Sequence, residues 1–428
     1  MSRIAEFEKQ GYEEKVVSAP ESSLPTLPLP DESVCPFGPV PEVRQLRENN
    51  SALVQVRCPT GITAWLVTRY ADVREVLGDP RRFSSRGGTA GHVLNNMPAE
   101  SPIEEGDFFR MDGAAHLRFR RAIAPAVGTV RRIAEIRPMA QRIVNDTLDG
   151  LAAAPHPVDL HEQFSKPITT AVIAQLFGVP YADRAVFHQV AQSLFSTATE
   201  QDDFSEVLQP LFGYVNELVA ARRAEPGDDA LSILVRRNDG LAQPLTDLEL
   251  VKITAGLLAA GYDTTASLIT YGVLALLRFP EQYALLHKDP TAVTGAAEEL
   301  LRLLADGGGL LRVATVDTEI GGNPIAEGDY VVVAVQAANQ DPRRFPDPER
   351  LDITRSDNHH MGFGFGPHQC VGQQVARLEL TTVLDILPRR VPSLRLAVPL
   401  DEVEFKTDTV IYGPAHLPVT WDTLLPRS

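Results

Sequence analysis

One cysteine of this chain stands in a segment whose residue types can support metal chemistry. The segment GFGFGPHQCVG, residues 362–372, surrounds Cys370 with glycines, a proline and a histidine, and a helical pattern follows directly. Glycines let a backbone approach a bulky, flat group closely. The N–H groups at the start of the helix near Val371 would stabilise a thiolate, which is the form of cysteine that binds metals.

The number of available ligands narrows the kind of metal site. Zinc and iron–sulfur sites need several protein ligands, whereas the other two cysteines, Cys35 and Cys58, are unclustered and far away in the sequence. Haem needs only one protein ligand, because the porphyrin supplies four nitrogens. The alternative is a buried free cysteine beside a glycine-rich turn, and for a lone cysteine that alternative is favoured. The spacing of the residues around Cys370 reverses this preference.

The spacing F-x-x-G-x-x-x-C-x-G, formed by Phe363, Gly366, Cys370 and Gly372, resembles the haem-ligand loop of the cytochrome P450 family. The resemblance extends over residues 25–421 and implies a haem b (iron protoporphyrin IX) with the Cys370 thiolate as axial ligand of the iron. It also implies O2 as co-substrate. Phe363, Gly364 and Gly372 would then form the bed of the porphyrin.

Two further motifs follow the family's order along the chain. The segment EELLR supplies Glu299 and Arg302 at E-x-x-R spacing, and FPDPER supplies Arg350. The resemblance implies that these three residues form a buried ion-pair cluster on the thiolate side of the haem, a role that suits a bidentate arginine–carboxylate pair. An E-x-x-R pair alone is common in helices. Its position between a long helix and the cysteine loop makes it informative.

Haem carries two propionates, which are costly to bury without cations. The resemblance implies four partners for them. These are His116 and Arg120 at H-x-x-x-R spacing in HLRFR, Arg312 in the strand after EELLR, and His368 two residues before the cysteine. For His116 and Arg120 the alternative is an ordinary solvated helix face.

The segment AAGYDTT resembles the family's oxygen-activation element and supplies Ala260, Gly261, Asp263 and Thr264. The resemblance implies that Gly261 leaves room for dioxygen beside the haem and that Asp263 and Thr264 form a catalytic proton relay. Thr264 would bond back to the carbonyl four residues earlier and loosen the helix. The alternative is that both residues merely disturb a buried helix. A buried, unpaired carboxylate is costly, which favours the functional interpretation.

The same resemblance places the substrate walls in the 84–110 loop, the 195–208 connection and five mostly apolar positions, Leu257, Ala260, Gly308, Leu310 and Ile411. Such walls predict a medium-sized, largely apolar organic substrate. The similarity is greatest to soluble actinobacterial-type members that tailor secondary metabolites. Hydroxylation is the expected reaction, and epoxidation or oxidative aromatic coupling remains the alternative.

Electrons must come from another protein, because the chain lacks a G-x-G-x-x-G nucleotide unit and a cysteine cluster. The resemblance implies a ferredoxin-type donor with its reductase. Four arginines, Arg118, Arg121, Arg131 and Arg132, would contribute to a basic docking face, although ordinary helix solvation explains each of them equally well. Two other functions are a haem-binding sensor, which has no need of Asp263 and Thr264, and a non-catalytic helper, which would be expected to lose Cys370.

These residues require a large, mostly helical framework. A helical pattern dominates residues 114–300, and its longest segment starts with a capping box of Thr246 and Glu249. This segment is apolar on nearly all sides and is about 50 Å long, so we expect a central buried helix. Short strands are expected around ALVQVRC and TAWLVTR, after residue 305 and near the C-terminus. The fold class is therefore mainly α with minor β, as in the triangular helical prism of the P450 fold. A single domain is expected over residues 21–428, after an N-terminal tail of residues 1–20.

Composition restricts the location and the partners. The 428 residues are 44% hydrophobic and carry a net charge of −16, which argues against a general nucleic-acid binder. No apolar stretch is long enough to span a membrane, and no signal peptide is visible. Three cysteines make a disulfide framework improbable, so the cytoplasm is the expected compartment.

Overall fold

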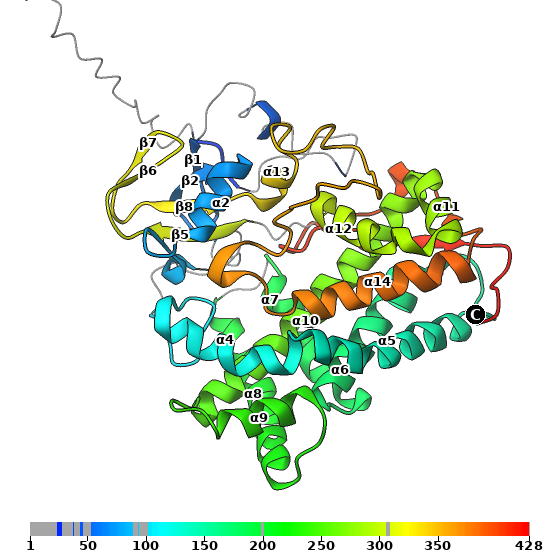
Figure 1. Ribbon diagram of the computed structural model, residues 1–428, viewed down its shortest axis with the longest axis horizontal. Coiled ribbons are helices and arrows are strands. Elements are labelled where there is room, and N and C mark those ends of the chain that lie inside the picture. Colours follow the sequence, from blue (N-terminus) through cyan, green and yellow to red (C-terminus); the bar gives the residue numbers. More distant parts are fainter. Residues whose placement is uncertain are drawn as a thin grey trace, which may run out of the picture.

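A computed structural model describes residues 24–27, 37, 43–45, 53–88, 93, 102–197, 201–304 and 309–427, without the side chains of 201–205. Figure 1 shows a mixed sheet with short helices on one side and a larger helical region beside and below it. The tail predicted for residues 1–20 lies outside the described residues. None of the helices in the described ranges is long and apolar enough to cross a membrane.

The main sheet has five strands in the order β1-β2-β8-β5-β3, and only β2 and β8 are parallel neighbours. The strands are β1 (Leu53–Arg57), β2 (Thr63–Val67), β8 (Tyr330–Val333), β5 (Leu310–Ala314) and β3 (Phe83–Ser84). The β1–β2 hairpin confirms the prediction from ALVQVRC and TAWLVTR. Strand β5 carries Arg312, which is paired with Val331 of β8. One of the predicted propionate partners, Arg312, therefore lies on a strand of the main sheet.

Two smaller sheets complete the β structure. One has the order β4-β10-β9 and the other consists of β6 and β7. Their bounds are β4 (Val158–Asp159), β10 (Pro418–Thr420), β9 (Arg395–Leu396), β6 (Thr318–Ile320) and β7 (Asn323–Ile325). Because β10 pairs with β4 and β9, the C-terminal segment is anchored beside the helical region rather than in the main sheet.

Twelve α-helices lie in the described part of the chain. They are α2 (Tyr70–Gly78), α4 (Gly113–Val127), α5 (Val130–Gly150), α6 (Lys166–Phe177), α7 (Ala185–Phe195), α8 (Gln201–Ala224), α9 (Ala230–Asn238), α10 (Asp247–Arg278), α11 (Pro280–Lys288), α12 (Val293–Leu304), α13 (Val335–Asn339) and α14 (Gln373–Arg390). The helical pattern that was predicted to dominate residues 114–300 corresponds to helices α4 to α12. A mainly α fold with minor β is thus confirmed.

The long helix α10 has 32 residues, and most of its side chains are buried. Its capping box is formed as predicted: Glu249 N donates to Thr246 Oγ1 over 3.2 Å, and Thr246 N donates to Glu249 Oε2 over 2.8 Å. These two bonds satisfy backbone groups that would otherwise lack partners at the helix start. The buried course of α10 confirms the expected central helix.

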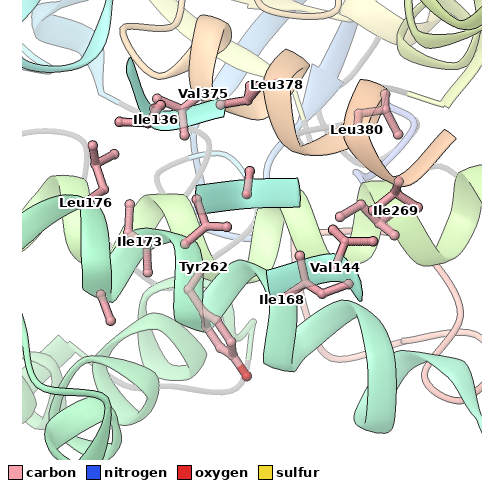
Figure 2. Close-up of a cluster of buried hydrophobic side chains, with 14 of the residues drawn as sticks. Ile136, Val144, Ile168, Ile173, Leu176, Tyr262, Ile269, Val375, Leu378 and Leu380 are labelled. Atoms are coloured by element: carbon pink, nitrogen blue, oxygen red, sulfur yellow. The ribbon is translucent and has the colours of Figure 1, made fainter. Parts of the chain in front are cut away.

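Helices α5, α6, α10 and α14 share one apolar core. Figure 2 shows side chains from all four helices converging, and each is buried. The labelled members are Ile136 and Val144 of α5, Ile168, Ile173 and Leu176 of α6, Tyr262 and Ile269 of α10, and Val375, Leu378 and Leu380 of α14. Full burial of one such aliphatic side chain contributes about 1.5–3 kcal/mol. This packing fixes α10 relative to α14, the helix that the cysteine loop enters.

Candidate active site

The cysteine loop, residues 362–372, is held in a tight backbone conformation. Cys370 N donates to the carbonyl oxygen of Phe363 over 2.8 Å, and Gly364 N donates to that of Met361 over 2.7 Å. Gly364 and Gly366 have φ values of +73° and +75°, in the left-handed region that favours glycine. A Cβ at Gly366 would also collide with the carbonyl oxygen of Leu77 in α2. Both glycines are therefore required by the loop itself.

Cys370 lies just before α14, where N–H donors and cations surround its sulfur. Its side chain is accessible to solvent although it lies deep within the protein, so it borders internal space. Burial raises the pKa of the Cys370 thiol, while backbone N–H groups of Gly372 and Gln373 and the cations Arg120 and Arg377 oppose this rise. Donors and cations directed at one sulfur are what a metal-binding thiolate needs.

Near Cys370, a group of ion pairs and hydrogen bonds holds the loop against α12 and α14, and the sequence motifs did not predict it. Arg377 stacks its guanidinium 4.6 Å from the Phe363 ring centroid and donates to Glu298 over 2.7 and 3.0 Å. His360 Nε2 lies 2.9 Å from the same carboxylate. Burial raises the pKa of Glu298, but its hydrogen bonds with His360 and Arg377 outweigh this effect and lower the pKa to about 2. The basic residue seven positions after the cysteine was the one available signal in the sequence.

The E-x-x-R pair is fully buried and bidentate. Arg302 donates from Nε and Nη2 to Glu299 over 2.8 and 2.9 Å, and neither side chain is exposed. Arg355 Nε lies 3.2 Å from the same carboxylate, and Asn358 Nδ2 donates to it over 3.0 Å. A buried pair of charges is stable only when its remaining hydrogen-bonding capacity is satisfied in this way.

The prediction that the Arg350 side chain joins this cluster is wrong. Arg350 is exposed, and only its carbonyl oxygen takes part, accepting from Arg302 Nη2 over 3.3 Å. The turn closed by Arg350 N and Asp347 O directs the side chain outward. A second turn, closed by Arg355 N and Asp352 O, brings Arg355 back to the cluster instead.

The four predicted propionate partners come from three elements. His116 and Arg120 lie on α4, Arg312 on β5 and His368 in the cysteine loop. The rings of His116 and His368 stack with centroids 3.9 Å apart, and Arg120 Nη1 donates to the Gln369 carbonyl over 2.8 Å. Arg312 Nη1 donates to the Leu311 carbonyl over 2.7 Å. Helix α4 is therefore tied directly to the cysteine loop.

Electrostatics indicate a buried cluster with an excess of positive charge. Burial, together with His368 and Arg120, lowers the pKa of His116 to about 4. Burial lowers the pKa of Arg312 to about 10, against the attraction of Asp112. Asp112 is the acid of this cluster, and its Oδ1 lies 3.0 Å from His368 Nε2. A largely buried guanidinium bonded to a neutral carbonyl is suited to a further anion. The chemistry of a haem with two carboxylates fits this donor set and the Cys370 thiol.

One stripe of α10 is less buried than the rest of the helix. Leu257, Ala260, Thr264 and Leu268 are half-buried and follow one another at helical spacing, while most of the helix is buried. Thr264 Oγ1 donates to the carbonyl oxygen of Ala260 over 2.7 Å, which is the back-bond predicted from the sequence. Asp263 is buried on the adjacent side of the helix. This stripe combines an apolar wall with a single hydroxyl.

The role expected of Gly261, to leave space beside the haem, stays a prediction, but the structure gives this glycine a second reason. A Cβ at Gly261 would lie 2.7 Å from Ile173 Cδ1 of α6. Glycine at this position therefore lets α6 pack closely on α10. The small residue on the half-buried stripe is Ala260.

The predicted substrate positions lie on separate elements. Leu257 is half-buried on α10, and Leu310 begins β5, where its Cδ1 lies 4.0 Å from a Cβ built at Gly364. Ile411 is buried in a segment that is joined to the end of α7 by the bond from Val410 N to the Phe195 carbonyl. Gly308 and much of the 84–110 loop lie outside the described residues.

The expected basic docking face is largely neutralised by nearby acids. Arg118 forms an ion pair with Glu249. Arg131 and Arg132 both pair with Glu135, over 2.9 and 3.4 Å. These pairings support the solvation alternative for the three arginines.

Comparisons with known proteins extend over nearly the whole chain. A family model described as Cytochrome P450 matches residues 41–390. The vitamin D3 dihydroxylase of Streptomyces griseolus is 40% identical over 403 residues, covering 92% of this chain and 96% of that protein. The nocardicin C N-oxygenase of Nocardia uniformis subsp. tsuyamanensis is 40% identical over 395 residues, covering 90% and 98%. The crystal structure of CYP105P1 in complex with filipin I has a TM-score of 0.86 at 40% identity, covering 94% of this chain and 99% of that chain.

Proposed function

Because the chain belongs to the cytochrome P450 family and is therefore a monooxygenase, we propose that it oxidises a medium-sized, largely apolar organic molecule. The reaction is a hydroxylation, and the substrate is a secondary metabolite or an intermediate of its biosynthesis. The proposal rests on the Cys370 thiol, which is accessible and is surrounded by N–H donors and cations.

A haem b would be held by residues from three parts of the chain, the cysteine loop, α4 and β5. Cys370 would ligate the iron, with Phe363, Gly364 and Gly372 forming the bed of the porphyrin. His116, Arg120, Arg312 and His368 would meet the propionates. When bound, the haem supplies oxygen activation, and its thiolate ligand pushes electron density that favours O–O cleavage. The cationic cluster around Arg312 supports this arrangement, because it has more positive charge than Asp112 balances.

Protons would be delivered by Asp263 and Thr264. The Thr264 hydroxyl lies on the half-buried stripe, and its bond to the Ala260 carbonyl orients it there. Asp263 is the nearest ionisable side chain in the sequence and is mostly buried. A hydroxyl on the stripe and a carboxylate on the preceding residue, which would move toward it to deliver a proton, could form a positioned acid relay.

The substrate class follows from the apolar surroundings and from the relatives. Leu257, Ala260 and Leu268 lie on the same half-buried stripe of α10 as Thr264, so the surface offered to a substrate there is mainly hydrocarbon. The names of two relatives given above refer to vitamin D3 and nocardicin C, and the structure of CYP105P1 is a complex with filipin I. These molecules support the proposal of a medium-sized organic substrate for this chain.

The electron donor would be a ferredoxin with its reductase, as in other P450s of this class. We place its docking surface on the thiolate side, at the surface hollow beside the cysteine loop. This hollow is lined by Tyr70, Arg74, Arg344, Asp357, His359, His360, Met361, Phe365 and Gln369. Arg74 is held 4.7 Å from the Phe365 ring centroid, which keeps a cation close to the loop. A fixed cation at this place suits an acidic protein partner.

The test is a turnover experiment with the haem-loaded protein, a ferredoxin, its reductase and candidate substrates. Candidates are first selected from a library of organic molecules by the shift that they cause in the haem absorption band. The expected result is a product that has gained one oxygen atom, labelled when 18O2 is supplied. Binding of apolar natural products without any oxygen incorporation would contradict the proposed reaction. A response only to small, charged molecules would contradict the substrate class.

A further inference from the structure

A lysine from the C-terminal part of the chain reaches the proposed proton donor of α10. Lys406 Nζ donates to Asp263 Oδ1 over 3.3 Å and to Ser267 Oγ over 2.8 Å. The side chains of Lys406 and Asp263 are only 14% and 11% exposed. The pair is therefore shielded from solvent. Water and salt weaken the attraction between two such buried charges less than between exposed charges.

The segment that carries Lys406 packs on α10 independently of this pair. Lys406 N donates to the Gly413 carbonyl over 3.0 Å, which closes the segment into a turn. A Cβ at Gly413 would lie 3.8 Å from the Cβ of Ser267, and the Phe405 ring packs against that of Tyr271 with centroids 6.0 Å apart. Lys406 is thus presented to α10 by a packed turn rather than by a freely moving side chain on the surface.

Helix geometry separates this ion pair from the half-buried stripe. Asp263 and Ser267 are one turn apart and share a face, whereas Asp263 and its neighbour Thr264 point about 100° apart. Lys406 joins the first two residues, while Thr264 bonds back to Ala260 on the stripe. The carboxylate of Asp263 is consequently held on the Lys406 side and not on the side of the Thr264 hydroxyl.

We propose that Lys406, anchored by Ser267, is a positioning residue that restrains the carboxylate of Asp263 between proton deliveries. A buried carboxylate without a cation takes up a proton or finds another partner. With Lys406 present, the excursions of the Asp263 side chain toward Thr264 are limited by the ion pair. Ser267 holds the ammonium group in place when the carboxylate leaves it. This inference rests on the proposed relay role of Asp263.

The test compares haem-loaded wild type with Lys406→Met, Asp263→Asn and the double variant. Lys406→Arg is the conservative rescue. Thr270→Val is a matched control, because Thr270 lies on the same helix but bonds His161 and Ser165. Product per electron, hydrogen peroxide release, the solvent deuterium isotope effect and the thermal unfolding midpoint are measured for each variant. An unchanged haem absorption spectrum shows that a variant is folded.

We expect Lys406→Met to reduce product per electron by roughly tenfold, which is less than the roughly 10²–10⁴-fold that a positioned acid itself contributes, because Lys406 acts only through Asp263. The same change should have no further effect in the Asp263→Asn background, and Lys406→Arg should restore most of the yield. The shift in unfolding midpoint of the double variant should differ from the sum of the shifts of the two single variants, as expected for residues in direct contact. Thr270→Val should lower the midpoint and leave product per electron unchanged.

Two results separate this inference from the function on which it rests. If Asp263→Asn lowers product per electron and Lys406→Met does not, the positioning role of Lys406 is wrong while the relay stands. Additive effects of the two substitutions on product per electron would also overturn it. If Asp263→Asn itself leaves product per electron and the isotope effect unchanged, the relay role of Asp263 fails, and the inference falls with it.

Discussion

Arg355 Nε lies 3.2 Å from the Glu299 carboxylate, five residues beyond the arginine that the sequence motif had indicated. Glu299 therefore receives two guanidinium groups, because Arg302 already binds it in bidentate form. Arg355 also donates to the Pro346 carbonyl over 2.9 Å, which ties the proline-rich segment before the cysteine loop to α12. The cluster thus connects helix and loop through one buried carboxylate.

Replacing Arg355 should destabilise the protein far more than replacing Arg350. Arg355→Ala removes a mostly buried partner of Glu299 and should cost about 3 kcal/mol of unfolding free energy, the lower limit for breaking a buried charge pair, since Arg302 remains. Arg350→Ala, the matched control, changes an exposed side chain and should stay within about 0.5 kcal/mol of wild type. Denaturant unfolding measures both. A larger loss for Arg350→Ala would contradict the cluster described above.

Gly261 offers a direct test of the contact between α6 and α10. Gly261→Ala places a methyl group against Ile173 Cδ1 and should cost about 1–3 kcal/mol by overpacking, partly offset by the better helix propensity of alanine. In an Ile173→Val background Cδ1 is absent, so the same change should be neutral or stabilising. Unfolding midpoints of the four proteins give this coupling. If Gly261→Ala instead perturbs the haem absorption and is not rescued by Ile173→Val, the glycine faces the haem after all.

The parts of the fold that the sequence predicted are those set by local patterns. The long helix follows from its capping box and continuous apolar composition, and the β1–β2 hairpin from two short apolar segments around one turn. The back-bond of Thr264 is a contact across a single helical turn. Each of these features depends on residues close together in the chain, so one sequence is sufficient.

The features that escaped prediction depend on long-range packing. The pairing of Lys406 with Asp263 joins residues 143 positions apart, and no local motif marks the lysine. The role of Gly261 depends on how closely α6 approaches α10. Two consecutive turns place Arg355, and not Arg350, beside Glu299, because the first turn directs the Arg350 side chain outward and the second directs that of Arg355 inward. The spacing of the motifs identified the correct segment for the arginine of the Glu299 cluster. It did not identify which arginine of that segment the turns direct inward.

Cys370 and Cys58 should respond differently to replacement. Cys370→Ser removes the proposed iron ligand, so the reduced protein with carbon monoxide should lose the red-shifted thiolate-type absorption band. Cys58 is buried, and burial raises the pKa of its thiol to about 11, so it stays a neutral core residue. Cys58→Ala should lower stability and keep the band. Persistence of the thiolate band in Cys370→Ser would show that another residue ligates the iron.

Thr264→Ala should separate proton delivery from binding. The hydroxyl would be lost, while the apolar stripe and the cysteine loop stay intact, so haem content and substrate-induced absorption shifts should be unchanged. Product per electron should fall by roughly tenfold or more, with a matching rise in hydrogen peroxide. Thr265→Ala changes the next residue, which is buried away from the stripe, and serves as the control. Equal product per electron in both variants would contradict the relay role of Thr264.

His161 should make the protein sensitive to acid. Burial, with the nearby cations Lys406 and Lys166, lowers the pKa of this histidine to about 3, and its Nδ1 lies 2.8 Å from Thr270 Oγ1. The unfolded chain takes up the proton near the ordinary pKa of about 6.5, whereas the folded protein does not. The contribution of neutral His161 is therefore complete above pH 6.5 and declines as pH falls from 6.5 toward 3.

The His161→Gln variant isolates this effect from the other titrating groups. It should be less stable than wild type at pH 7, because a buried ring and its hydrogen bond are lost. The difference in unfolding free energy should then shrink by up to about 1.4 kcal/mol for each unit of pH below 6.5. Substitution of the exposed His359 by glutamine controls for the loss of an imidazole as such. A difference that widens on acidification would contradict this expectation, because it would mean that His161 is protonated in the folded protein. The buried contact of His161 with Thr270, near Lys406, would then carry an additional positive charge.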